Sequence, residues 1–315
     1  MLIATEKVTY ILEDNGSQGE PFFLYEGSDI VHIEEGRDLH VIALTNGDII
    51  LVKDGKTEQL TSGIEDSIES LALLEEARLN LLIGTEPPHI YRLKDDGSSA
   101  KRITSFDALE VRDKWDTPWG GPPAVRSLAI TRDGGVYADI HVGSIMRSPD
   151  WGETWEPVTP TLHRDVHQVS TCVASLERVY ANTYRAVYIS EDRGRSWLHR
   201  ANDLDQRYGR AIVVNPQDRD CILATVSDGP QGTNVHGQLY RTEDAGNTWV
   251  HVTEVFPPST RHNINTFHVA SSPQGLAWAV VDGKLYLSRD RGKCWTTFWE
   301  APEPIEMVKP SQLTS

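Results

Sequence analysis

The sequence has few cysteines, a shortage of basic residues and no long apolar run. Its three cysteines, Cys172, Cys221 and Cys294, are an odd number and are too sparse for a disulfide framework. They lie in strand-like runs or beside a turn, which favours small apolar core residues over a metal site or a nucleophile. This cysteine usage makes the cytoplasm the expected location.

Basic residues are outnumbered, with 30 lysines and arginines against 46 aspartates and glutamates and a formal net charge of −16. Nucleic acid and anionic membranes would repel this charge, so neither is expected as the main partner. No apolar run approaches the roughly 20 residues of a membrane helix. Residues 1–7 also lack the basic region and the apolar stretch of a signal peptide. These absences predict a soluble protein.

One eight-residue pattern, Ser/Thr-x-Asp-x-Gly-x-x-Trp, recurs four times, at residues 148–155, 190–197, 242–249 and 288–295. Asp and Ser/Thr side chains bond the backbone of a tight turn, and glycine adopts the positive φ that such a turn needs. The tryptophan then returns to the sheet and buries a large apolar surface. Each copy follows a short β-rich run, so we assign these motifs to hairpin turns that stabilise the fold.

Three degenerate copies of this turn precede the four clear ones, at Gly16, Gly55 and Gly97. The seven turn glycines are then separated by 39, 42, 55, 42, 52 and 46 residues. Such intervals are close to the roughly 40–50 residues of a four-stranded propeller blade. The spacing predicts an all-β fold, a seven-bladed β-propeller of four-stranded antiparallel blades, in one domain that spans residues 1–315.

The first blade lacks a strand at its start. Residues 2–5, 7–12 and 22–25 supply three strands, and nothing β-rich precedes residue 2. We expect residues 305–308 to supply the missing innermost strand, so that N- and C-terminal strands together close the ring and remove its free edges. The alternative is six blades with the N-terminal segment packed on the side. Residues 67–80 have helical propensity, but the periodicity assigns them to strands.

The repeated octapeptide resembles the Asp-box of BNR-repeat β-propellers. Across the whole chain, the runs at residues 84–89, 119–123 and 165–168 are similar to bacterial BNR-like proteins labelled sialidase-like or photosystem assembly factor-like. The resemblance implies the propeller fold and adds little about activity. Sialidases of this type also need an early Phe-Arg-Ile-Pro-like motif and a Tyr–Glu pair. That motif is absent and Tyr184 and Tyr208 have no adjacent glutamate, which argues against sialidase activity.

In a propeller the Asp-box turns join the third and fourth strands of each blade on one face. The loops between the second and third strands, and the crossovers between blades, therefore emerge on the opposite face around the axis. Trp, His, Arg and carboxylate side chains gather in those loops. Convergent groups of these types suit a polar ligand better than plain packing does. We predict a ligand site at this axial face.

Two sets of residues are predicted to form that site. The candidates for acid–base catalysis are Glu86, Asp139, His141, His167 and Asp228. The candidates for ligand binding are Trp115, Trp119, Arg126, Tyr184, Arg185, Tyr208, Arg210 and Asn265. Tryptophans on a Gly/Pro loop suit stacking on a sugar or planar ligand, and arginines suit an anionic group.

Structural alternatives exist for several of these residues. Glu86 before two prolines could cap a turn. Arg126 and Arg210 could form structural ion pairs with Asp139 and Asp228. The two tryptophans could cover the core.

No cofactor is predicted. His163 and His167, with Asp165 between them and His141 from the neighbouring blade, invite a metal ion as the less favoured alternative. A four-residue offset aligns two ligands only on a helix, and this segment runs from a loop into a strand. Histidines that serve as hydrogen-bond partners are the preferred interpretation.

The sequence therefore predicts a propeller that binds a small polar, anionic or carbohydrate-like ligand at its axial face. One alternative is a hydrolase or lyase that uses a histidine or carboxylate there, and another is a protein-interaction scaffold. The expected partner is a small molecule or glycan, or a protein that docks on the same face. The enzyme alternative requires a buried carboxylate or histidine with a shifted pKa, and ligand binding requires an accessible tryptophan.

Overall fold

The computed structural model describes residues 1–12, 19–27, 29–36, 38–75, 78–158, 161–232 and 234–310. Strands in these residues form seven antiparallel sheets of four strands each. Helix is confined there to α1 (Thr104–Asp107) and the 3-10 turn η1 (Glu110–Lys114), and neither is long and apolar enough to cross a membrane. The fold is an all-β, seven-bladed β-propeller, as predicted. The six-bladed alternative is wrong, because the N-terminal strands belong to a complete sheet of their own.

Contacts divide the chain into two compact units. Unit 1 comprises Met1–Ile130, Gly134–Pro157 and Lys309–Ser315, and unit 2 comprises Thr131–Asp133 and Val158–Val308. The prediction of one domain over residues 1–315 stays a prediction.

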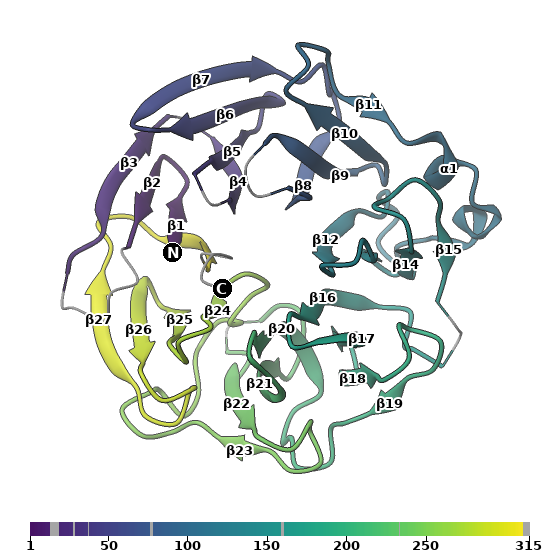
Figure 1. Cartoon of the computed structure of the whole chain (residues 1–315). Helices are drawn as coiled ribbons and strands as arrows, with labels where there is room; N and C mark the ends of the chain where they lie inside the picture. Colours follow the sequence, from purple (N-terminus) through teal and green to yellow (C-terminus); the bar gives the residue numbers. More distant parts are fainter. Residues whose placement is uncertain are drawn as a thin grey trace. The chain divides into compact units, whose positions relative to one another are not determined.

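Three sheets lie wholly within unit 1, and each runs through its strands in chain order (Figure 1). They are β4 (Ile30–Glu35), β5 (His40–Leu44), β6 (Asp48–Lys53) and β7 (Lys56–Thr61); β8 (Ser67–Leu73), β9 (Asn80–Glu86), β10 (Ile90–Lys94) and β11 (Lys101–Arg102); and β12 (Val125–Ile130), β13 (Val136–Ile140), β14 (Ser144–Ser148) and β15 (Glu156–Pro157).

Unit 2 also holds three sheets in chain order. They are β16 (Val166–Cys172), β17 (Ser175–Thr183), β18 (Ala186–Ser190) and β19 (Leu198–His199); β20 (Tyr208–Asn215), β21 (Asp218–Ser227), β22 (Gln238–Thr242) and β23 (Val250–His251); and β24 (Val269–Ser271), β25 (Ala277–Val281), β26 (Lys284–Ser288) and β27 (Thr296–Glu300).

The remaining sheet joins the first and last strands of the described chain. Its order is β28-β1-β2-β3, with β28 at Ile305–Lys309, β1 at Leu2–Thr5, β2 at Val8–Ile11 and β3 at Phe22–Glu26. Ile305, Met307 and Val308 of β28 are buried, while Glu306 between them is exposed. The C-terminal strand predicted at residues 305–308 is therefore confirmed.

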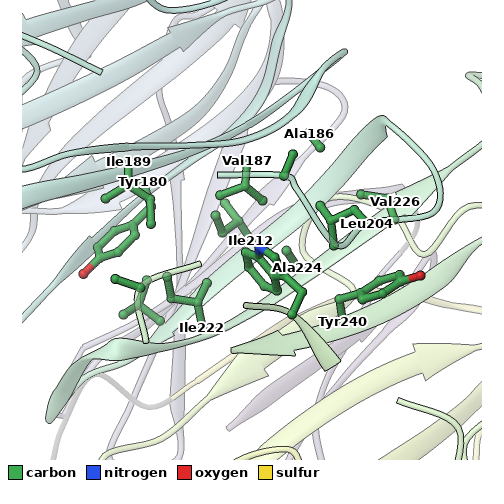
Figure 2. Packing of buried hydrophobic residues seen from close by; sticks show 14 of the residues in the cluster. Tyr180, Ala186, Val187, Ile189, Leu204, Ile212, Ile222, Ala224, Val226 and Tyr240 are labelled. Carbon is green, nitrogen blue, oxygen red and sulfur yellow. The ribbon is translucent and has the colours of Figure 1, made fainter. Parts of the chain in front are cut away.

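Packing between neighbouring sheets explains the apolar strands. In unit 1, Val41 and Ile49 share a buried cluster with Leu81 and Ile83 of the next sheet. In unit 2, Tyr180, Ile189, Ile212 and Ile222 form the equivalent layer (Figure 2). A sheet covered on both faces needs near-continuous apolar strands. This burial overrides the helical propensity of residues 67–80, whose described part is strand at both ends, as predicted.

The octapeptide motifs form four turns with one hydrogen-bond pattern. In the first, Ser148 Oγ accepts the Gly152 N–H at 2.8 Å, and Asp150 Oδ1 accepts the Thr154 N–H at 2.8 Å. The same two bonds recur in each of the other three turns. Gly152 has a φ of +86°, which a side chain would strain.

The tryptophan of each motif is buried, as predicted. Of the degenerate copies, Gly55 and Gly97 lie in turns that follow β6 and β10, with φ of +68° and +75°. The third copy, at Gly16, lies outside the described residues.

Candidate functional site

The predicted site residues lie near the start of first strands, near the loops between second and third strands, or in the connections between sheets. Because neighbouring strands are antiparallel, the loop between the second and third strands lies opposite the turn between the third and fourth. Unit 1 contains Glu86, Trp115, Trp119, Arg126, Asp139 and His141, and unit 2 contains His167, Tyr184, Arg185, Tyr208, Arg210, Asp228 and Asn265. That all of them surround one axial opening stays a prediction.

A β-bulge recurs near the start of the first strand in five sheets. The register shifts between Ile30 and His32, Ile68 and Ser70, Val125 and Ser127, Val166 and Gln168, and Gly209 and Ile212. A bulge inserts an extra residue and re-aims its side chain, and bulges are common beside binding sites. The inserted positions are occupied by Val31, Glu69, Arg126, His167 and Arg210–Ala211. Three of the predicted functional residues thus occupy the same structural position.

In unit 1 the bulged Arg126 holds a histidine. Its Nη2 donates to His141 Nδ1 at 2.7 Å, and a guanidinium can only donate, so Nδ1 of this imidazole is an acceptor. The His141 ring in turn lies 4.8 Å from the Trp119 ring, centroid to centroid. Sequence reasoning placed these three residues at one site, and the structure brings them together.

Trp119 is presented by a compact turn. The Thr117 hydroxyl donates to the Gly121 carbonyl, and the Gly120 N–H donates to the Thr117 carbonyl at 3.0 Å. The Trp119 side chain is 61% exposed although it contacts His141. An exposed indole fixed beside an arginine–histidine pair is available to stack on a ligand.

Glu69 lies in the bulge of β8 and was not singled out from the sequence. Its Oε1 accepts a hydrogen bond from Ser67 Oγ at 2.9 Å. Burial raises the pKa of Glu69; the Ser67 hydrogen bond opposes the rise, the charge of Glu86 adds to it, and Arg126 lowers it again. A signal for Glu69 existed, because it follows an apolar residue at the start of a first strand, as Arg126 does.

The other candidate residues of unit 1 contact neighbouring residues of the strands and the core. Asp139 is buried within β13, where its Oδ2 accepts from Ser127 Oγ at 2.9 Å across the sheet. Trp115 is partly buried against Phe106, at 5.8 Å between ring centroids, with the Arg112 guanidinium over its ring. Glu86 ends β9 opposite Ser67.

In unit 2 a series of rings links two neighbouring sheets. His163 stacks on Tyr184 with ring centroids 5.7 Å apart and planes inclined by 19°. Tyr184 meets Tyr208 edge to face at 5.8 Å, and the Arg210 guanidinium lies 4.9 Å from the Tyr208 centroid. Tyr184 is 50% exposed, whereas Tyr208 is buried. Three predicted ligand-binding residues, Tyr184, Tyr208 and Arg210, therefore lie together.

Backbone bonds hold Tyr184 in place. The Tyr184 N–H donates to the Asp165 carbonyl at 2.9 Å, and the Arg185 N–H donates to Thr183 Oγ1 at 2.9 Å. Burial lowers the pKa of His163, against the opposing effect of Asp165, so the ring that stacks on Tyr184 is neutral at pH 7. The backbone that carries Tyr184 is therefore hydrogen-bonded on both sides, while its ring is half exposed to solvent.

Three more predicted residues of unit 2 occupy surface loops. Asp228 Oδ2 contacts His236 Nδ1 at 2.5 Å within the loop that joins β21 to β22. Arg185 and Asn265 are both exposed, and the Asn265 carbonyl accepts the His268 N–H at 3.0 Å. Roles for these side chains in binding or catalysis stay predictions.

The histidines proposed as metal ligands do not share one environment within unit 2. His163 stacks on Tyr184, and its Nδ1 accepts the Asp165 N–H at 3.2 Å. His167 is buried in the bulge of β16, with Nε2 at 3.2 Å from Asp165 Oδ1. His141 belongs to unit 1, and its predicted association with the other two stays a prediction.

Comparison with known proteins identifies several relatives. A family model described as sortilin, neurotensin receptor 3, matches residues 143–255. A probable oligoxyloglucan-reducing end-specific xyloglucanase of Neosartorya fischeri is 25% identical over 249 residues, 68% of this chain and 28% of that protein. A xyloglucanase of a Paenibacillus species is 25% identical over 205 residues, 51% of this chain and 19% of that protein. The chain thus spans less than a third of the length of these relatives.

Solved structures share the fold at lower identity. A GH74 xyloglucanase from Xanthomonas campestris has a TM-score of 0.61 at 18% identity, covering 86% of this chain and 45% of that one. An ancestral GH74 enzyme has a TM-score of 0.64 at 15% identity, covering 88% and 39%. YCF48, solved bound to a D1 peptide, has a TM-score of 0.59 at 17% identity, covering 85% and 80%. At these identities the likeness shows the propeller fold alone.

Proposed function

We propose that this protein is a carbohydrate-binding β-propeller, and that it recognises its ligand through the aromatic group of unit 2, formed by His163, Tyr184 and Tyr208. The single observation that carries the proposal is the Tyr184 ring. His163 stacks on this ring, the plane of the Tyr208 ring lies nearly perpendicular to it, and half of the Tyr184 side chain is exposed to solvent. A fixed aromatic face of this kind suits the apolar face of a sugar ring.

Charged side chains beside the ring add polar recognition. Arg210 lies over Tyr208, and the exposed Arg185 directly follows Tyr184. Arginines donate several hydrogen bonds in a fixed geometry and attract anionic substituents. Because the chain carries a net charge of −16, arginines at the ligand site would offset repulsion of an acidic ligand locally. The site therefore fits neutral and acidic oligosaccharides alike.

The relatives support a carbohydrate ligand over other polar molecules. Two curated proteins that align with more than half of this chain are named xyloglucanases. Xyloglucan oligosaccharides are therefore the first ligands to test, with acidic oligosaccharides beside them.

Isothermal titration calorimetry with xyloglucan oligosaccharides and with uronate-containing oligosaccharides measures the proposed binding. We expect Tyr184→Ala to weaken binding about fivefold or more, since an aromatic contact contributes about 1 kcal/mol beyond its buried area. Phe23→Ala is the matched control, because Phe23 is an exposed aromatic residue of β3 that is distant in sequence from Tyr184. Equal affinities of the wild type and Tyr184→Ala would refute the role of this ring.

A hydrolase is the second candidate, and Glu69 is the observation that favours it. A carboxyl group with a raised pKa beside a second carboxylate is what a glycosidase uses as its general acid. Glu69 would then donate a proton to the leaving oxygen, with Glu86 as the partner carboxylate.

Release of reducing ends from xyloglucan tests this second candidate. Under it, Glu69→Gln lowers the rate by at least a hundredfold while binding measured by calorimetry is kept. Glu110→Gln, which changes a glutamate of η1, is the control. If the wild-type protein binds oligosaccharides without cleaving them, the hydrolase proposal is wrong and the binding proposal stands. If the protein binds no oligosaccharide but binds a peptide, the carbohydrate proposal is wrong and a protein is the ligand.

A further inference from the structure

His167 is a buried histidine whose tautomer is fixed by the backbone. It occupies the bulge of β16, is fully buried, and its Nδ1 faces the Gly209 carbonyl within hydrogen-bond distance. A carbonyl oxygen only accepts, so the proton of the neutral ring lies on Nδ1. The other nitrogen, Nε2, then directs a lone pair at Asp165 Oδ1, 3.2 Å away.

The 3.2 Å separation of these two atoms can be compared with two kinds of contact. A protonated imidazole would donate to the carboxylate, and such charge-assisted bonds are about 2.7–2.9 Å long. Two ligand atoms that each lie about 2.0 Å from a tetrahedral ion are separated by about 3.3 Å. The observed distance of 3.2 Å is therefore one at which both atoms can bind the same ion.

We propose that Asp165 Oδ1 and His167 Nε2 bind a divalent first-row transition metal ion, with zinc as the best-fitting ion. One imidazole nitrogen and one carboxylate oxygen are ligands that suit zinc. The Asp165 side chain is 19% exposed, so solvent or a ligand reaches the remaining coordination positions. This site goes beyond carbohydrate binding, and neither proposal depends on the other.

Neighbouring groups hold both ligands as the outer shell of a metal site does. The bond from Nδ1 to Gly209 orients the imidazole, and the Thr266 hydroxyl donates to the His167 carbonyl at 3.0 Å. The Tyr184 N–H donates to the Asp165 carbonyl at 2.9 Å. β16 and β20, which carry His167 and Gly209, lie side by side (Figure 1).

A second His–Asp pair of unit 2 provides the contrast. His236 Nδ1 lies 2.5 Å from Asp228 Oδ2, and Asn234 Nδ2 donates to His236 Nε2 at 3.0 Å. Both nitrogens of this exposed ring are therefore engaged by side chains of the same loop. The pair His236–Asp228 thus forms a hydrogen bond, whereas we assign the pair His167–Asp165 to metal binding.

Titration of the full chain, freed of metal by chelator and dialysed, with zinc chloride tests the proposal. We expect one site that binds zinc with micromolar affinity or tighter, and at least tenfold weaker binding in Asp165→Asn, which keeps the volume of the side chain. His167→Ala should show the same loss, and thermal unfolding of each variant without metal reports whether it folds. Cobalt(II) as a second probe should give visible absorption bands typical of tetrahedral coordination.

His236→Ala is the matched control and should bind zinc as the wild type does. The proposal is overturned if the wild type binds zinc more weakly than micromolar or does not bind it. It is also overturned if folded Asp165→Asn and the control bind equally well. Oligosaccharide binding is measured separately, so its failure leaves the zinc result unaffected.

Discussion

In five sheets, an inserted residue near the start of the first strand places a different side chain at the same structural position. In unit 1 the bulge presents Glu69 in one sheet and Arg126 in the next, and in unit 2 it presents His167 and then Arg210. The backbone feature is constant and the side chain varies. A β-strand alternates its side chains between two faces, and a bulge breaks that alternation. Chemistry can therefore change at these positions while the sheet stays intact.

Gly209 is the residue whose replacement has the clearest expected cost. A Cβ at this position would lie 1.7 Å from Asn182 Oδ1, and Asn182 is itself buried and donates to the carbonyls of Ala211 and Thr225. We expect Gly209→Ala to lower the free energy of unfolding by about 3 kcal/mol, the cost of overpacking a rigid site. Urea denaturation measures this change.

Gly229→Ala is the control for this substitution. A Cβ at Gly229 would meet no atom within 4 Å, so the free energy of unfolding should stay within about 0.5 kcal/mol of the wild type. Equal stabilities of the two variants would show that Asn182 can move away at little cost.

At the scale of turns and strands, the four octapeptide turns share an electrostatic property. Burial acts to raise the pKa of Asp192, but hydrogen bonds from the Ser196 side chain and backbone outweigh it, and the pKa falls below its usual range. The pKa values of Asp150, Asp244 and Asp290 are lowered in the same way. Each carboxylate therefore binds its proton less readily in the folded protein than in the unfolded chain.

This property predicts a loss of stability in acid. A lowered folded-state pKa contributes stability that is present above the unfolded value, about pH 4, and is lost as the pH falls towards the folded value. The melting temperature should decline progressively below about pH 4. Asp192→Ala should cost about 1–2 kcal/mol at pH 7 and flatten that decline, as followed by circular dichroism.

Glu254→Gln, an exposed change outside the turns, should reproduce the wild-type profile. A melting temperature of Asp192→Ala that falls in acid as steeply as that of the wild type would contradict the role of this turn.

The sequence predicts elements better than it predicts the site, for a physical reason. Turn residues and apolar periodicity act locally, so the sheets and the strand at residues 67–73 follow from the pattern. Even the C-terminal strand could be predicted, because the first sheet lacked a strand. Tyr184, Tyr208 and Arg210 were identified as loop or strand-start residues, whereas Glu69 was missed because a bulge is not visible in a two-residue period.

At the scale of the whole molecule, β28 completes the sheet to which the N-terminal strands belong. It pairs with β1 in a sheet whose other three strands come from the N-terminus, and Val308 is buried there. We expect Val308→Asp to lower the free energy of unfolding by about 3 kcal/mol or more, because a charge is buried without a partner. Glu306→Ala, an exposed change on the same strand, should be nearly neutral. Urea denaturation compares the two, and equal stabilities would mean that β28 is dispensable.

The position of β28 also sets an order of events during synthesis. A ribosome makes β1, β2 and β3 well before β28, so their sheet stays one strand short until β28 has been translated. Until that strand arrives, β1 presents an open backbone edge that can pair with a neighbouring nascent chain. Closing the sheet also requires two distant parts of the polypeptide to meet, and contacts at such long sequence separation form slowly. Newly made chains are thus exposed to aggregation through this edge until β28 has been made, and dilution or a holding chaperone should raise the yield of folded protein.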